Sequence, residues 1–168
     1  MNIRSITAAD RDWVARHVAE IWGAEVVVAH GKIYHAAELP GFIAEMDGEK
    51  AGLITYHIAG DRIAGEACEI VTLDSLNEGR GIGTALIEAV KAVAGTAGCR
   101  RLWLITTNDN LHALGFYQKR GFRLIAVHPG AVDAARKLKP EIPLIGNDGI
   151  PITDEIELEI ARQMEFKT

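Results

Sequence analysis

The sequence predicts a mixed α/β fold of the α+β kind, in which a mostly antiparallel sheet is flanked by helices. Three apolar segments between residues 42 and 73 are separated by connections so short that the strands must run antiparallel. Two helical patterns follow, over residues 82–97 and 110–120, and each leads into another short apolar strand. The expected order is a strand, two helices, three strands, a helix, a strand, a helix and two strands.

The composition indicates a single domain, residues 1–168, and argues against nucleic acid and membranes as partners. Apolar residues make up 48% of the 168 positions, and the net charge of −5 excludes a general nucleic-acid binder. No apolar run is long enough to span a membrane, so no membrane partner is expected. Cys68 and Cys99 stand in apolar or helix-end contexts that fit free thiols, which predicts the cytoplasm. The basic clusters at residues 100–101 and 136–139 are interpreted as solvated surface.

The first forty residues are expected to contribute one strand and one clear helix. Asn2–Ile6 is a short strand, and Asp10 caps a helix whose apolar residues recur at helical spacing up to Trp22. Between residues 23 and 40 the pattern weakens, and glycine and proline interrupt it, which favours a loop and a short helix. Three polar aromatic residues of this stretch either line a pocket or belong to the plain surface: His30, Tyr34 and His35.

The meander occupies the middle of the chain. Phe42–Met46 and Ala51–Ile58 flank the pair Asp47-Gly48, which favours a tight hairpin turn. Glu66–Leu73 returns as the third strand.

The later elements alternate between helix and strand. The stripe of the helix over residues 82–97 is apolar, and Asn110 caps the second helix, which runs to about Arg120. Residues 129–153 indicate an ordered loop around a short helix at Ala131–Leu138. Residues 155–160 alternate strictly, so their three glutamates are expected to face water or, as a weaker alternative, to attract a cationic substrate.

A glycine-rich turn between a buried strand and a helix is the strongest functional signal in the chain. It runs Glu78-Gly79-Arg80-Gly81-Ile82-Gly83-Thr84. Glycines let a ligand approach the main chain, and unpaired N–H groups at a helix start bind phosphate. No Lys-Ser/Thr pair follows Gly83, as a P-loop would need, and the spacing does not fit a dinucleotide fingerprint. We therefore expect the turn to hold the pyrophosphate of a nucleotide-like cofactor, with a purely structural turn as the alternative.

Two motifs together resemble the GNAT superfamily of acetyl-CoA-dependent N-acetyltransferases. The family's turn, Gln/Arg-x-x-Gly-x-Gly/Ala, aligns with Glu78 through Gly83. Its later segment, Asn-x-x-Ala-x-x-Phe-Tyr-x-x-x-Gly-Phe, begins at Asn110 and ends at Phe122. The motifs fall within residues 66–128, and the expected strand order resembles the family fold from end to end. One departure is Glu78, where the family usually has Gln or Arg, because a carboxylate beside a pyrophosphate is unfavourable.

The resemblance implies roles for particular residues. Tyr117 matches the family's general acid, which protonates the departing thiolate, and Asn110 matches the residue that contacts the pantetheine arm. Their structural alternatives are a core aromatic and a plain helix cap. The backbone near Leu73 resembles the strand whose N–H polarises the acetyl carbonyl. The residues expected to bind acetyl-CoA are Leu73, Gly79, Arg80, Gly81, Ile82, Gly83, Thr84, Asn110 and Tyr117.

Glu69 is the expected general base. It lies within an apolar strand, where desolvation makes a carboxylate a stronger base, and some family members carry a base glutamate in a similar Glu-Ile-Val setting. Glu66, Asp74, His57 and ordered water are the alternatives.

These motifs predict direct acetyl transfer to the amine of a small molecule or peptide, without a metal. The six histidines never fall into an H-x-x-x-H or H-E-x-x-H spacing. Two other hypotheses stay open: a non-catalytic acyl-CoA-binding regulatory module, and a different nucleotide-binding α/β protein. A homodimer is a further expectation from the resemblance.

Overall fold

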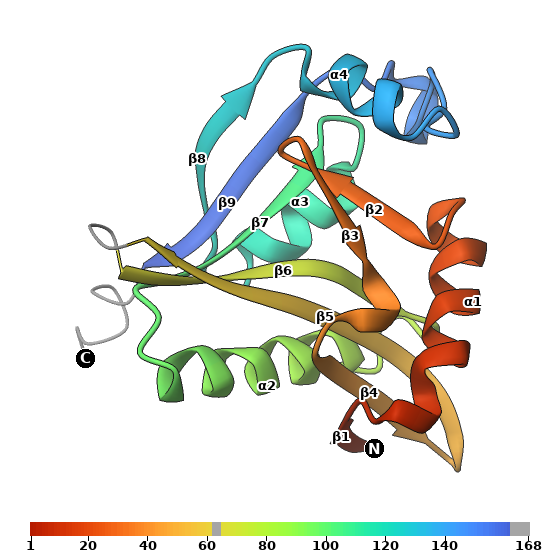
Figure 1. The fold of residues 1–168 in the computed structure, drawn as a ribbon, viewed down its shortest axis with the longest axis vertical. Coiled ribbons are helices and arrows are strands. Elements are labelled where there is room, and N and C mark those ends of the chain that lie inside the picture. Colours follow the sequence, from red (N-terminus) through yellow and green to blue (C-terminus); the bar gives the residue numbers. More distant parts are fainter. Residues whose placement is uncertain (62–64, 162–168) are drawn as a thin grey trace.

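A seven-stranded sheet, in the order β1-β4-β5-β6-β7-β9-β8, forms the centre of the protein in a computed structural model that describes residues 1–61 and 65–161 (Figure 1). Its pairs are antiparallel except for β6 with β7, which confirms the predicted mostly antiparallel sheet. The strands of this sheet are β1 (Asn2–Ser5), β4 (Gly41–Met46), β5 (Glu49–Asp61), β6 (Gly65–Ser75), β7 (Arg101–Thr107), β8 (Arg123–His128) and β9 (Glu155–Ala161). The helices are α1 (Arg11–Trp22), α2 (Ile82–Thr96), α3 (Leu111–Gln118) and α4 (Ala131–Leu138), with single 3₁₀ turns at Ala8–Asp10, Ala36–Glu38 and Asn147–Gly149.

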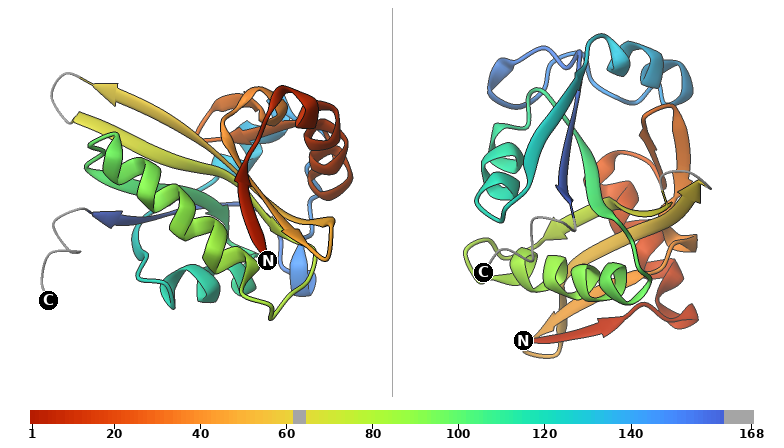
Figure 2. Two further views of the ribbon diagram at one scale, coloured as in Figure 1. Left: turned by 90° about the horizontal axis from the view of Figure 1, so that it is seen from below. Right: turned by 90° about the vertical axis from the view of Figure 1, so that its left-hand side faces the viewer.

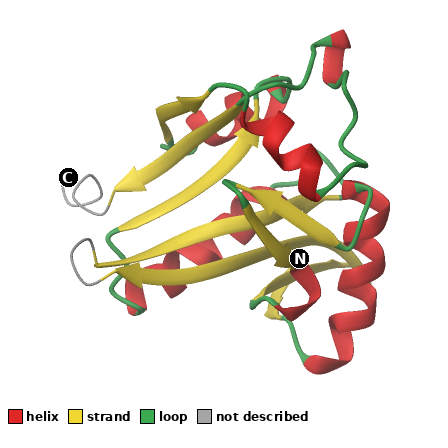
Figure 3. Ribbon diagram, turned by 45° about the horizontal axis from the view of Figure 1, so that its top comes forward, coloured by secondary structure: helices red, strands yellow, loops and turns green. Residues whose placement is uncertain are grey.

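Helices cover both faces of the sheet, so each face has its own apolar core. Figure 2 shows α2 and α3 on one face and α1 on the other, and Figure 3 separates the helices from the strands by colour. The apolar stripe of α2, including Leu86 and Val90, packs on Ile54 and Ile70. On the other face Val14 and Val18 of α1 belong to a second core with Leu53. Both faces of the central strands are therefore buried.

The short stretch from residue 23 to residue 40 departs from the prediction. Instead of a loop and a short helix it forms a second, two-stranded sheet from β2 (Val26–Ala29) and β3 (Lys32–His35), followed by one 3₁₀ turn. His30 and Gly31 connect the two strands, and both have positive φ, as a type I′ hairpin turn requires. The same conformation at Asp47 and Gly48 confirms the predicted hairpin between β4 and β5.

The sheet opens between β6 and β7. Their parallel pairing covers only Ala67–Ile70 against Arg101–Leu104. Just beyond it, Val71 is an extra residue in β6, because Thr55 pairs with Thr72 while Tyr56 pairs with Ile70. Strand β7 continues along β9, whereas β6 continues along β5, so the two halves of the sheet separate (Figure 1).

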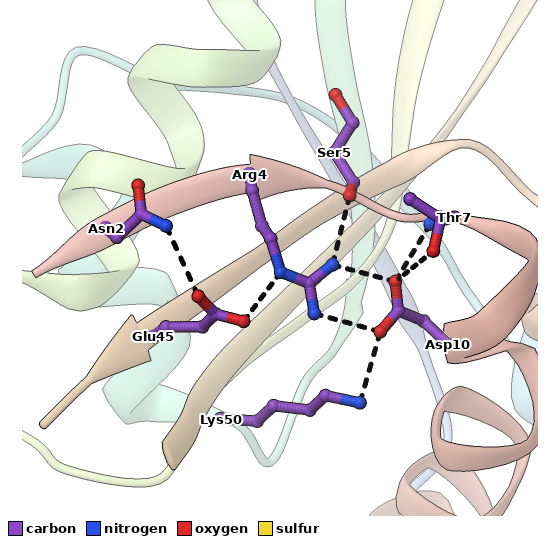
Figure 4. A network of polar contacts seen from close by, with 7 residues as sticks. All are labelled: Asn2, Arg4, Ser5, Thr7, Asp10, Glu45 and Lys50. Atoms are coloured by element: carbon purple, nitrogen blue, oxygen red, sulfur yellow. Dashed lines mark hydrogen bonds and ion pairs between the residues drawn. The ribbon is translucent and has the colours of Figure 1, made fainter. Parts of the chain in front are cut away.

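A polar network joins the first strand to the start of α1 (Figure 4). Arg4 donates two hydrogen bonds to Asp10, at 2.8 and 2.9 Å, and a third, of 2.6 Å, to Glu45. Lys50 reaches Asp10 at 3.1 Å, and the Thr7 N–H donates to the same carboxylate. Hydrogen bonds from Arg4 hold the pKa of Asp10 far below its usual range, so this nearly buried carboxylate stays ionised.

Residues 129–153 form an ordered segment around α4, as predicted, and Lys137 is exposed as expected, but Arg136 and Lys139 are structural rather than solvated. Arg136 donates to the backbone carbonyls of Ile142, Pro143 and Ile152. Lys139 is buried and donates to the carbonyl of Trp22 at 2.7 Å, and burial lowers the pKa of its ammonium group. Both side chains therefore donate to main-chain carbonyls, as buried polar groups need.

Among the described residues, no helix combines the length and the apolar character that crossing a membrane requires.

Candidate active site

A cavity of about 580 Å³ lies where the end of β6, the start of α2 and the length of α3 meet. We call it the glycine cavity. Its walls combine the glycine turn with side chains of α3, which are about 30 residues later in the chain. The lining residues are Leu73, Asp74, Ser75, Glu78, Gly79, Gly81, Ile82, Gly83, Thr84, Asn110, His112, Ala113, Phe116, Tyr117 and Arg120.

Backbone geometry in the turn leaves amide groups available to a ligand. Gly79 and Gly81 both have a φ of 75°, a conformation that costs most other residues free energy. Gly81 is the N-cap of α2 and makes no side-chain cap hydrogen bond, so the first N–H groups of the helix, from Ile82 onward, lack that partner. At Gly83 a Cβ would lie 2.8 Å from the ring of Phe116, so only glycine lets α2 and α3 approach this closely. The turn therefore has the geometry of an anion cradle.

The positive charge at the cavity wall comes from Arg120, a residue that was not predicted from the sequence. Arg120 lies over the face of Phe116, 3.5 Å from the ring centroid, and donates to the Thr84 hydroxyl at 2.9 Å. Glu78 is exposed and also lines the cavity, whereas Arg80 is exposed and does not line it. Arg120 is thus the cation placed to offset Glu78. Its position one turn after Tyr117, in the sequence Tyr-Gln-Lys-Arg, was the available signal.

Tyr117 of α3 and Asn110, the residue that caps this helix, both line the glycine cavity. Tyr117 is buried, and its ring packs edge-on against Phe116 and Phe122. Burial, and then the negative charge of Asp74, raise the pKa of its phenol above the ordinary value. The phenol therefore stays protonated at neutral pH. The Asn110 side chain accepts from the N–H of Ala113 at 3.2 Å, so it caps α3 and lines the cavity at once.

Asp74 is tied to the α1 face of the sheet. Its carboxylate accepts a hydrogen bond from the Trp22 indole at 3.0 Å and lies 3.5 Å from Nε2 of the buried His17. Leu73, its neighbour, packs against the core beneath α2 and lines the cavity. Of the alternative bases, Asp74 alone reaches the glycine cavity; Glu66 is exposed, and His57 packs against the ring of Tyr34.

Glu69, the expected base, does not line the glycine cavity. It is 3% exposed, and its two oxygens accept hydrogen bonds from Tyr34 Oη at 2.6 Å and from His30 Nε2 at 2.8 Å. We call Glu69, His30, Tyr34, Trp103 and Glu155 the His30 cluster.

The other members of the cluster fix His30 from two sides. The centroid of its ring lies 5.0 Å from that of the Trp103 ring, and its backbone N–H donates to Glu155 at 3.1 Å. Glu155 is buried, which corrects the expectation that all three glutamates of β9 face water. The partly exposed Glu157 and Glu159 pair with Arg101.

The comparisons with known proteins agree with this architecture. The model of the acetyltransferase (GNAT) family matches residues 7–122. The chain therefore belongs to the GNAT acetyltransferase family, and the fold and family predicted from its two motifs are confirmed.

Particular relatives have been found both among curated proteins and among solved structures. Two curated proteins of Bacillus subtilis (strain 168), both described as uncharacterized, are similar over most of their length. YxbD is 44% identical over 159 residues, 94% of this chain and 97% of that protein, and YdhI is 48% identical over 146 residues, 86% of each. A GNAT family acetyltransferase from Elizabethkingia anophelis, crystallised with acetyl-CoA bound, superposes with a TM-score of 0.68 at 22% identity, over 95% of this chain and 97% of that one.

Proposed function

We propose that the protein is an N-acetyltransferase that moves the acetyl group of acetyl-CoA directly to a primary amine of a small molecule or peptide. The observation that carries this proposal is that the glycine turn and the phenol of Tyr117 line the same cavity. Family membership supports an acyltransferase, and the acetyl-CoA bound to the Elizabethkingia relative supports the co-substrate.

The cavity fits acetyl-CoA in three respects. Its uncapped helix start suits a pyrophosphate, Arg120 adds a cation, and Asn110 and Leu73 lie along the path toward Tyr117. The N–H groups from Gly79 to Thr84 would hold the phosphates, and the main chain near Leu73 would polarise the acetyl carbonyl.

The chemistry then needs one acid and one base. The amine attacks the carbonyl carbon, a C–N bond forms, and the C–S bond breaks with the electron pair leaving on sulfur. Tyr117 protonates that sulfur, for which its neutral phenol is suited. The incoming ammonium group must lose a proton to a base, a task in which the buried Glu69 takes part. Overall, an ammonium and acetyl-CoA give an amide, free coenzyme A and one proton.

Two experiments together test the proposal. Calorimetry with acetyl-CoA, ATP and NAD should show binding of acetyl-CoA alone. A thiol-release assay with acetyl-CoA should then show turnover on at least one amine from a panel of spermidine, kanamycin, phenylethylamine and free-N-terminus peptides. Tight binding of ATP or NAD instead would contradict the proposal.

A non-catalytic acyl-CoA-binding module is the second candidate, and Glu78 in the cavity wall favours it. It predicts binding of acetyl-CoA without thiol release on the whole panel, and that result would replace the enzymatic proposal. We further propose a single catalytic domain in the cytoplasm, for which the buried Cys68, a thiol outside any disulfide, is the support. Homodimer formation stays a prediction from the resemblance.

A further inference from the structure

We propose that His30, at the tip of the β2–β3 hairpin, is the residue that takes the proton from the acceptor amine, and that Glu69 and Tyr34 are positioning residues behind it. This inference rests on the proposed function and deepens it. Proton abstraction, which was predicted for Glu69 alone, is then carried out on the face of the sheet that bears the β2–β3 hairpin.

Glu69 is closed off from an acceptor. Its side chain is 4% exposed, whereas that of His30 is 22% exposed. Tyr34 occupies one carboxylate oxygen and His30 the other. In the tautomer that carries its hydrogen on Nε2, His30 donates to this carboxylate oxygen. Nδ1 of a neutral His30 is then left with a lone pair, and it is the proton acceptor of this group.

A second observation is the position of the hairpin. His30 bonds to Glu69 on β6 and, through its backbone, to Glu155 at the start of β9, where β9 pairs with the end of β7. The tip therefore bridges the two halves of the sheet where β6 and β7 separate. Figure 2 shows the hairpin on the face opposite α2 and α3, whose side chains line the glycine cavity. An amine entering from the hairpin face would meet His30 before an acetyl group held from the cavity side.

A third observation is backbone strain. His30 has a φ of 42°, a region that is uncommon for residues other than glycine, although asparagine, aspartate and histidine adopt it more often than the rest. Asparagine or glycine before Gly31 would suit this turn better. The ring of this residue packs against Trp103 and its backbone N–H bonds to a buried carboxylate, so the imidazole is held in one orientation, as a proton acceptor must be.

Titratable and charged groups reach His30 from every neighbouring element. They are Glu69 from β6, Tyr34 from β3 and Glu155 from β9, with His57 of β5 behind Tyr34 and Arg101 of β7 over the Trp103 ring. Glu69 contacts the ring of His30 and Glu155 accepts from its backbone N–H, so both carboxyl groups touch this residue directly.

The proton step balances in the following way. The ammonium gives one proton to Nδ1 of His30, and the neutral amine attacks the acetyl carbon. After the attack the nitrogen loses a second proton. That proton passes to the phenolate of Tyr117 and replaces the one that Tyr117 has given to sulfur. The imidazolium, paired with Glu69, then releases its proton to solvent, which restores both groups.

The decisive variant is His30→Asn, because asparagine suits the turn and cannot act as a base. We expect its melting temperature to equal or exceed that of the wild type and its acetyl-CoA affinity to be unchanged. Its kcat, with the best amine of the panel, should fall by about a hundredfold. His35→Asn, at the exposed end of the same hairpin, is the matched control and should retain wild-type kcat.

Two further readouts separate a base from a structural residue. The loss in His30→Asn should shrink when the acceptor is replaced by its O-alkyl hydroxylamine analogue, whose amino group is already neutral at the assay pH. In His30→Gly, added imidazole should restore part of the lost kcat. Wild-type-like kcat in a folded His30→Asn, or equal losses with both acceptors and no imidazole rescue, would overturn the inference. If the wild type itself transfers no acetyl group to any amine, the proposed function fails instead.

Discussion

The two faces of the sheet opening are built in different ways. The glycine cavity is formed mostly by two continuous segments, residues 73–84 and 110–120, and its key feature is exposed backbone. The His30 cluster instead joins side chains that are 39 and 125 residues apart in sequence, through buried polar contacts. The first can be recognised as a motif, whereas the second exists only after the chain has folded.

This difference has a functional meaning within the family. Main-chain amides can hold a cofactor without depending on side-chain identity. Side chains on a hairpin loop instead set the chemistry of an acceptor site. We therefore expect substitutions in the cavity to change acetyl-CoA binding and transfer for every acceptor, and substitutions in the cluster to change acceptor chemistry alone.

The largest effect is expected for Tyr117→Phe. Without the phenol hydroxyl no acid is placed to protonate the leaving sulfur. We therefore expect kcat to fall by about a hundredfold or more, while acetyl-CoA still binds. Steady-state thiol release and calorimetry measure the two quantities. Tyr56→Phe, a partly buried phenol outside the cavity, is the control and should leave both unchanged. Equal kcat values for Tyr117→Phe and the wild type would show that Tyr117 is not the general acid.

Asp10→Asn tests whether the network at the start of α1 is structural only. Losing the Arg4 partner should lower the free energy of unfolding by about 2 kcal/mol at neutral pH, without changing the kcat of the folded fraction. The measurement is urea denaturation at a series of pH values, with Asp12→Asn on the exposed side of α1 as the control.

The pH dependence of that difference has a defined sign. The folded-state pKa of Asp10 lies below the unfolded value of about 3.9, because Arg4 stabilises the carboxylate. The contribution is therefore complete above about pH 5 and is lost as the pH falls through that unfolded value toward the folded one. A gap between wild type and variant that widened below about pH 4 would contradict this assignment.

Gly83→Ala tests whether acetyl-CoA binding in the glycine cavity depends on the close approach of α2 and α3. The added Cβ would meet the Phe116 ring at 2.8 Å and push α2 away from α3, so the acetyl-CoA dissociation constant should rise about tenfold. Gly95→Ala in the same helix, where a Cβ meets nothing within 4 Å, should bind acetyl-CoA normally and be slightly more stable. Identical affinities in the two variants would show that the approach of the helices does not matter for binding.

The smallest effect is expected for Arg120→Met. It removes the cation that offsets Glu78 at the cavity wall but keeps an unbranched side chain over Phe116. We expect acetyl-CoA to bind about three- to fivefold more weakly, with a reduced dependence on salt, because the lost term is electrostatic. Lys119→Met, at the exposed C-cap residue of α3, serves as the control. An unchanged salt dependence in Arg120→Met would exclude a phosphate contact.

The sequence predicted the glycine turn, α3 and the meander because each depends on neighbours in the chain. It missed the β2–β3 hairpin because the turn is His30-Gly31 rather than the familiar Asn-Gly, so local chemistry argued against it. Alternation in β9 correctly placed Leu158 and Ile160 in the core but could not reveal that Glu155 is buried by a hairpin 125 residues away. Likewise, Glu69 was correctly expected to be buried, but its partners could not be read from its neighbours.

Hydrogen exchange of individual amides, with and without saturating acetyl-CoA, tests the central claim most directly. The account predicts strong protection of the amides from Gly79 to Thr84 on binding, and little change at the tip of the β2–β3 hairpin until an amine acceptor is added. Binding of acetyl-CoA that left the turn unprotected and protected the hairpin instead would contradict the division of the two faces.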